Sequence, residues 1–112
     1  MNPELLTVAQ IEDKLLQGQV SPPELADIKM TLSVKASHLT GLLEPILLEK
    51  HVWLRDHREQ YKSDAATRNA WQSTERGLEE TAIRSKLKRI DLLLRGISSQ
   101  LRVKEQEARN II

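Results

Sequence analysis

The chain has 112 residues, a length typical of one domain, and 39% of them are hydrophobic, 29% charged and only 3% aromatic. This composition suits a folded helical protein rather than a disordered one, and the absence of cysteine excludes disulfide bonds and thiol catalysis. The net charge of +1 conceals segregation: residues 1–34 hold five acids against two bases (−3), and residues 84–104 seven bases against one acid (+6).

The amino-terminal sequence lacks a basic region followed by an apolar core, so we expect no signal peptide. No uncharged apolar stretch approaches the roughly 20 residues that a membrane-spanning helix needs. A cytoplasmic location is the expectation.

A short helix is predicted over residues 7–17. Thr7 and Gln10 have the spacing of a capping box, and Gly18 stands where a helix ends. A helix this short is marginal alone in water, so we expect it to pack on the rest of the chain. Its apolar face consists of Val8, Ile11 and Leu15.

A long helix is predicted over residues 22–61, about 60 Å in length. Ser21 can cap it, Pro22 suits its first position, and Glu24 completes the capping pattern. A seven-residue apolar repeat follows, formed by Leu25, Leu32, Leu39, Ile46 and Trp53, with Ile28, Ala36, Leu42 and Leu43 at intermediate positions. Pro45 predicts a kink near residues 41–45, where Gly41 lies four residues earlier; a full break is the alternative.

Residues 62–74 are predicted to form a polar connector in which Ser63 and Asp64 open a short helical turn that carries Trp71 inward. Ser73 and Thr74 then supply a cap for a last helix over residues 75–110, about 54 Å long. That helix has an apolar heptad stripe, interrupted only by Lys104. The stripe consists of Ile83, Leu87, Ile90, Leu94, Ile97, Leu101, Ala108 and Ile111.

Two long helices of similar length joined by a short connector predict an all-α, coiled-coil-like antiparallel hairpin, with the short helix packed on it. Several apolar residues fall outside the two heptad stripes, and the short helix can cover only some of them. We therefore expect a homo-oligomer, in which a subunit interface covers the others. These residues are Leu47, Leu48, Leu54, Leu92, Leu93 and Val103.

No catalytic or metal-binding pattern is present in the sequence. His38, His51 and His57 lack the spacing of a metal site, the acidic pairs lie on helices rich in Lys and Arg, and the four glycines form no phosphate-binding loop. The sequence therefore predicts a protein that is not an enzyme and uses no metal or cofactor.

Basic residues are the functional signal. Lys88, Arg95, Arg102 and Arg109 recur every seven residues, and a second cluster near the connector comprises Arg55, Arg58, Lys62, Arg68 and Arg76. Such groups can neutralise phosphates, and Tyr61 and Trp71 beside the second cluster suit single-stranded nucleic acid, whose bases stack on aromatic rings. The alternative is that the charges only solvate the helices and that Trp71 fills the core of the connector.

Residues 61–68, Trp71, Gly77, residues 84–88 and residues 101–110 together resemble a recurring type of short phage protein. That type is similar to the UvsY recombination mediators, and the resemblance covers roughly residues 25–110. It implies two long helices with a polar connector, assembly into rings, binding of single-stranded DNA, and help in loading a recombinase or annealing protein in place of a single-strand-binding protein.

In that family, DNA-contacting basic residues precede a tyrosine at the end of the first long helix, and Arg55 and Arg58 precede Tyr61 here. Residues 1–24 have no counterpart in the family. The nucleic-acid-binding residues expected in this chain are Arg55, Arg58, Lys62, Arg68, Arg84 and Lys88.

Two other functions remain open. The acidic first helix would repel nucleic acid but could occupy a basic groove, which favours a phage-type inhibitor or adaptor that docks on a host enzyme. A structural coiled-coil subunit of a virion or scaffold would assemble without either ligand.

Overall fold

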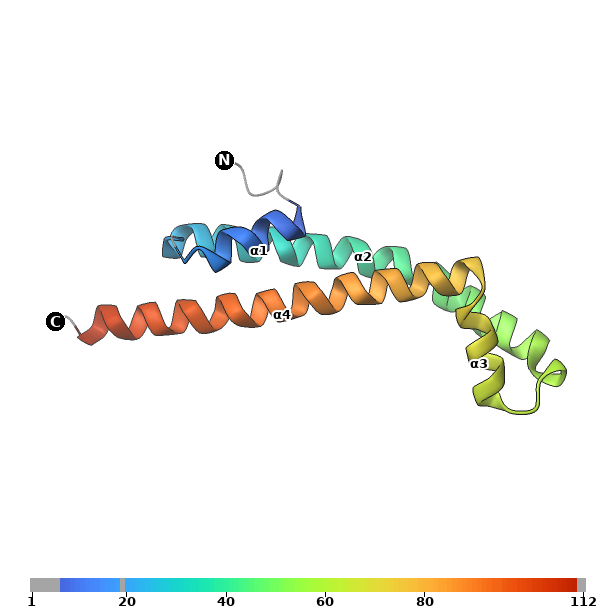
Figure 1. Ribbon diagram of the computed structural model, residues 1–112. Coiled ribbons are helices and arrows are strands. Elements are labelled where there is room, and N and C mark those ends of the chain that lie inside the picture. The colour runs from blue at the N-terminus through green and yellow to red at the C-terminus, as the bar shows by residue number, and fades with distance from the viewer. Residues whose placement is uncertain (1–6, 19, 111–112) are drawn as a thin grey trace. The chain divides into compact units, whose positions relative to one another are not determined.

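The computed structural model describes residues 7–18 and 20–110, and this part of the chain is all-α, with 90% helix and no strand. Four α-helices are present: α1 (Val8–Leu16), α2 (Pro22–His57), α3 (Asp64–Gln72) and α4 (Glu75–Asn110), with the short 3-10 helix η2 (Arg58–Gln60) after α2 (Figure 1). None of these helices is long and apolar enough to cross a lipid bilayer. Ile111, the last residue of the predicted stripe, lies outside the described residues.

The predicted start signals of the first two helices and the predicted end signal of the first helix are confirmed. Thr7 Oγ1 accepts a hydrogen bond from Gln10 N (3.2 Å), and Gln10 Oε1 accepts one from Thr7 N (2.9 Å). Gly18 follows α1 with φ +70°, a left-handed conformation that glycine adopts without steric cost. Ser21 Oγ accepts from Glu24 N at 3.4 Å at the start of α2.

The end of the second helix differs from the prediction. α2 continues through Pro45, so the alternative of a full break there is wrong. It ends at His57 rather than Tyr61, because the backbone tightens into η2, where Tyr61 N donates to Arg58 O at 3.3 Å. Arg58 Nη1 also donates to Tyr61 O at 3.0 Å, which holds this turn closed.

The segment predicted as a polar connector is mostly a helix. Ser63 Oγ caps α3 by accepting from Ala66 N at 3.1 Å, and the buried Thr67 donates its hydroxyl to Ser63 O at 2.9 Å. Trp71 is 2% exposed, which confirms the prediction that the connector carries it inward. A capped start and one large buried side chain thus stabilise a helix of nine residues where a turn was expected.

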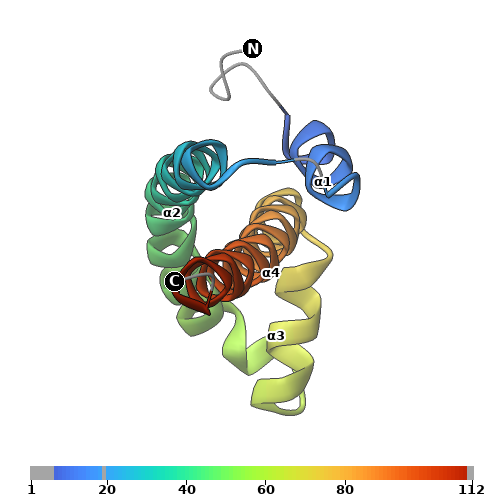
Figure 2. The same cartoon turned by 90° about the vertical axis from the view of Figure 1, so that its left-hand side faces the viewer.

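Contacts between residues divide the chain into two compact units. Unit 1 contains residues 1–36 and 88–112, and its described elements are α1, the first part of α2 and the last part of α4, which are adjacent in the end-on view of Figure 2. Lys104, which interrupts the apolar stripe, donates from Nζ to Val20 O at 2.5 Å, a carbonyl just before α2. The apolar core of this unit consists of Ile11, Val20, Leu25, Ile28, Leu32, Ile90 and Ile97.

Unit 2 contains residues 37–87, and it is built around Trp71. Trp53 on α2 lies with its ring centroid 5.7 Å from that of Trp71 and stacks on His57 at 4.1 Å. Leu43 and Ile46 of α2 complete the buried apolar side chains.

The junction of α3 and α4 in unit 2 depends on Gly77. Thr74 Oγ1 donates to Trp71 O (2.6 Å) and accepts from Gly77 N (3.0 Å), which brings the start of α4 against the end of α3. A Cβ on Gly77 would lie 1.9 Å from Trp71 O, a distance that no real contact permits. The glycine is therefore required by close backbone approach, at a position where φ is not unusual.

The two predicted stripes are largely buried or half-buried, except that Ala108 is exposed and Leu42 is 47% exposed. Of the six apolar residues outside the stripes, Leu54 and Leu93 are half-buried, whereas Leu48 is 73%, Leu92 59%, Val103 51% and Leu47 36% exposed.

Candidate nucleic-acid interface

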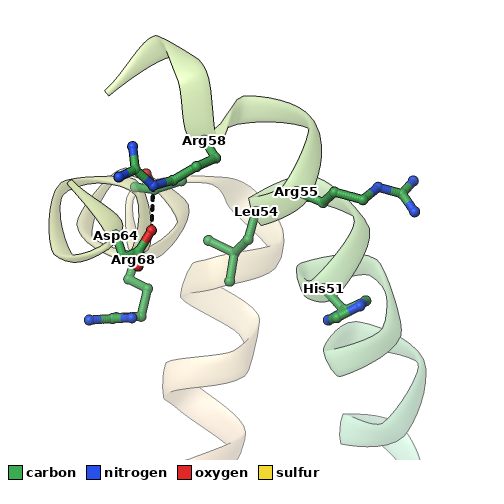
Figure 3. Close-up of a pocket in the computed structure, with 7 residues that line it drawn as sticks. His51, Leu54, Arg55, Arg58, Asp64 and Arg68 are labelled. Carbon is green, nitrogen blue, oxygen red and sulfur yellow. Dashed lines mark hydrogen bonds and ion pairs between the residues drawn. The ribbon is translucent and has the colours of Figure 1, made fainter. Parts of the chain in front are cut away.

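A pocket of about 270 Å³ lies at the end of unit 2 where α2, η2 and α3 meet (Figure 3). It brings together Arg55, Arg58 and Arg68, three of the six predicted site residues. The other residues that line it are His51, Leu54, Asp64 and Thr67.

Helical spacing places these side chains on one surface. His51, Leu54 and Arg55 follow the i, i+3, i+4 pattern of one helix face, which Arg58 extends by one turn. Thr67 and Arg68 stand three and four residues after Asp64, so α3 presents them together. Leu54 is half-buried and Thr67 is buried, and the pocket therefore has a partly apolar floor beneath cationic side chains.

The three arginines differ in their partners. Arg58 Nε forms an ion pair with the Asp64 carboxylate, and Arg55 Nε pairs with Asp56 at 3.2 Å. Arg68 has no ion pair among the described residues. Figure 3 shows Arg58 and Arg68 on either side of Asp64, with Arg55 directed away from them. Asp64 thus neutralises part of the positive charge, and an anion at this site would compete with it for Arg58.

The remaining predicted site residues do not line this pocket. Lys62 is exposed in the segment between η2 and α3. Arg84 belongs to the same unit, but its Nε donates to Glu80 Oε2 at 2.7 Å. Lys88 is an exposed residue of unit 1.

Arg76, which the sequence groups with this cluster, is engaged elsewhere. Its guanidinium donates two hydrogen bonds to Glu49, each 2.8 Å long, and one to Glu79 at 2.8 Å. These bonds lower the pKa of Glu49 and raise that of Arg76. The sequence could not reveal this pair, because its partners are 27 residues apart on different helices.

Trp71 is also unavailable to a ligand. It is 2% exposed, and its Nε1 donates to Glu80 Oε1 at 2.8 Å. The expectation that Trp71 stacks on nucleobases is therefore wrong, and the alternative, a core residue of the connector, is confirmed. Tyr61 is half-buried.

Glu80 joins three helices beside the site. Glu80 is 6% exposed, and its carboxylate accepts from Trp71 of α3, Lys50 of α2 (3.2 Å) and Arg84 of α4. Burial alone would raise its pKa, but the hydrogen bonds from Arg84, Trp71 and Lys50 together lower the pKa below the usual value. This network holds the helices on which the pocket is built.

Sequence reasoning missed four pocket residues: His51, Leu54, Asp64 and Thr67. The i, i+3, i+4, i+7 spacing from His51 to Arg58 was a readable signal for the α2 side of the pocket. The α3 side had no such signal, because residues 62–74 were not predicted to form a full helix.

The basic stripe of α4 lies in unit 1 and is partly paired. Arg95 bonds to Asp91 one turn earlier at 3.1 Å, while Lys88, Arg102 and Arg109 are exposed. Arg89, beside the stripe, forms an ion pair with Glu12 of α1, whose pKa is lowered by these hydrogen bonds. Part of the acidic charge of α1 is thereby neutralised within the unit.

Among residues 7–18 and 20–110, no group of three His, Asp or Glu side chains is arranged to hold a metal ion. Comparison of the chain with protein-family models, with curated proteins and with solved structures finds no match.

Proposed function

We propose that this protein is a non-enzymatic, homo-oligomeric accessory protein that binds single-stranded DNA and assists homologous recombination or strand annealing. The observation that carries the proposal is the pocket lined by Arg55, Arg58 and Arg68, in which Arg58 and Arg68 lie on either side of Asp64 near the half-buried Leu54. Arginine is suited to this role because its planar guanidinium holds phosphate through two parallel hydrogen bonds.

The mode of binding follows from the charges of the pocket. A backbone phosphate competes with Asp64 for Arg58 and also contacts Arg68, while Lys62 adds charge beside them. An unpaired base can pack its apolar face against the half-buried Leu54, a hydrophobic contact that requires no base-specific hydrogen bond. A duplex keeps its bases stacked and offers only phosphates, so single strands are the preferred ligand.

The proposal includes an antiparallel hairpin of α2 and α4 as the scaffold. Lys50 and Glu49 of α2 bond to Glu80 and Arg76 of α4, which supports this pairing in unit 2. Exposed apolar side chains such as Leu48 and Leu92 support association of copies, since such residues are commonly covered at subunit interfaces.

The resemblance to UvsY mediators supplies the biological role that we propose. The oligomer would hold single-stranded DNA at several sites at once and present it to a recombinase, an annealing protein or a single-strand-binding protein in the host cytoplasm. Several weak sites on one assembly give tight binding through effective concentration.

Fluorescence anisotropy with a labelled oligo-dT tests the proposal. Binding should weaken steeply as salt increases, because phosphate contacts release counterions. The double variant Arg58→Gln/Arg68→Gln should lose at least about tenfold in affinity, since each lost phosphate contact lowers affinity at moderate salt. The matched variant Arg102→Gln/Arg109→Gln removes the same charge from α4 and should retain binding. No detectable binding at low salt, or equal losses in the two variants, would refute the assignment of this pocket.

A second candidate is a protein-interaction module, which one observation favours. In unit 1 a groove of about 320 Å³ lies between α1 and α4, and Leu16 at its edge is 85% exposed. An adaptor would use this groove and α1 to dock on a host enzyme. Charge reversal at Arg55, Arg58 and Lys62 separates the candidates, because it should abolish DNA binding but leave docking through α1 intact.

A further inference from the structure

We propose that two copies of this chain associate through the outer face of α2 in unit 2, in antiparallel orientation, with Leu48 of each copy against Val52 of the other. This inference rests on the proposed function for its premise that the protein acts as an oligomer. It adds the face, the orientation and the residues of contact.

Exposed apolar side chains concentrate on α2. Of the ten large hydrophobic residues that are exposed in the described part of the chain, six belong to this helix. Leu48 is 73% and Val52 45% exposed, and they stand one turn apart in unit 2. The six are Met30, Val34, Leu42, Leu47, Leu48 and Val52.

The face that carries Leu48 is directed away from the core of its own unit. At 3.6 residues per turn, Leu48 lies about 160° around the helix from Ile46, which is 2% exposed. In unit 2, α2 is therefore apolar on two opposite faces, and the described residues of the unit cover only the face of Ile46. On the outer face, Gly41 and Pro45 precede Leu48 at helical spacing, and neither residue has a long side chain. The space around Gly41 is open, so a second helix can approach closely there.

The charges that border the apolar pair identify the occupant as a second copy. Glu44 stands one turn before Leu48, and Arg55 stands about one turn after Val52. A two-fold axis near residue 50, perpendicular to the helix, places Leu48 of each copy against Val52 of the other. The same axis places Glu44 of each copy near Arg55 of the other, so that each contact occurs twice. An isologous contact requires this kind of self-complementary pattern. Glu44 has no ion pair among the described residues, and Arg55 has only the exposed Asp56.

This arrangement has a consequence for the DNA site. A two-fold axis that reverses the helix direction keeps the same flank of α2 on the same side of the dimer. The flank of His51 and Arg58 borders the outer face, so both pockets would open on one side, about 14 Å apart along the helix. One DNA strand could then contact both sites of a dimer.

Sedimentation velocity of the full chain without DNA, over a wide range of protein concentrations, tests the interface. Leu48→Glu should weaken self-association at least tenfold, because it buries a carboxylate against an apolar partner. Leu78→Glu is the matched control: it changes a leucine of the same unit that is 61% exposed, on α4, and should leave self-association unchanged. Helix content from circular dichroism verifies that both variants fold.

The charge pair provides an independent test. Glu44→Arg alone and Arg55→Glu alone should each weaken association about tenfold through like-charge contacts, and the double variant should recover to within about threefold of the original. The inference would be overturned if the protein were monomeric at all concentrations. It would also be overturned if Leu78→Glu weakened self-association and Leu48→Glu did not, or if the double variant did not recover self-association. Anisotropy with oligo-dT, measured separately, distinguishes these failures from a failure of DNA binding.

Discussion

The substitution Glu80→Ala probes the charge network that holds α2, α3 and α4 together in unit 2. It removes the acceptor of the Trp71 indole and leaves that N–H buried, because Trp71 is 2% exposed. An unsatisfied buried donor costs about 1–3 kcal/mol. Lys50 also loses its partner, but its side chain is 26% exposed and can be rehydrated, as can that of Arg84, which is 55% exposed.

The expected loss in free energy of unfolding is therefore about 2–4 kcal/mol, less than the cost of removing one member of a fully buried pair. This is a large part of the 5–15 kcal/mol typical of a domain. Glu80→Gln retains an acceptor for Trp71 and removes only the charge, so it should cost about half as much. Glu79→Ala is the control, because Glu79 is an exposed neighbour whose ion pair with Arg76 contributes less than about 1 kcal/mol.

Urea denaturation measures these differences. Tryptophan fluorescence reports on unit 2, where both Trp53 and Trp71 lie, and circular dichroism reports on the helices of the whole chain. A cost for Glu80→Ala equal to that of Glu79→Ala would refute the network as a source of stability. A cost for Glu80→Gln equal to that of Glu80→Ala would show that charge, rather than the bond to Trp71, dominates.

Two further predictions concern unfolding measured in the same way. Gly77→Ala should destabilise the protein by at least about 3 kcal/mol, because the new Cβ clashes with Trp71 O. Gly96→Ala, at an open helical position, should instead stabilise it by about 0.5–1 kcal/mol. Equal effects of the two substitutions would contradict the close approach of Gly77 to Trp71 O. The pKa of Glu80 is lower in the folded protein than in the unfolded chain, whose ordinary value is about 4.3. As the pH falls below that ordinary value, the unfolded chain therefore binds more protons than the folded protein, and the free energy of unfolding should decrease until the pH reaches the lower pKa of the folded state. Glu80→Gln should reduce this acid-induced loss of stability, and an unchanged pH profile would contradict the assignment.

Local signals in the sequence were sufficient for the starts of the helices and for the bounds of the last one, but not for the end of α2, which lies at His57 rather than Tyr61. Thr7, Ser21 and Ser63 are capping residues whose effect depends only on the next three positions, so they could be recognised without a tertiary structure. The last helix has the predicted bounds, residues 75–110. The length of α3 was not predictable in this way, since a polar segment becomes helical here partly because Trp71 is buried by other elements.

The candidate site was predicted only in part. The spacing of Arg55 and Arg58 from each other and from Tyr61 is a property of the sequence, and so is the surplus of basic residues in this region. Which of the basic residues are paired depends partly on other helices. Arg76 is bound to Glu49 of α2, a pairing with no local signal, whereas Arg84 is bound to Glu80 one turn earlier on its own helix.

The sequence by itself determined the all-α fold, the start signals of the helices and the inward position of Trp71, because periodicity and capping act over a few residues. Only the tertiary structure decided which charges pair across helices, as Arg76 does with Glu49, that Glu80 is buried beneath three donors, and that Arg55, Arg58 and Arg68 line one pocket. The physical reason is that a charge on a helix surface has the same local signature whether its partner is solvent, DNA or a side chain 30 residues away. The register in which the helices pack determines which partner each charged side chain meets.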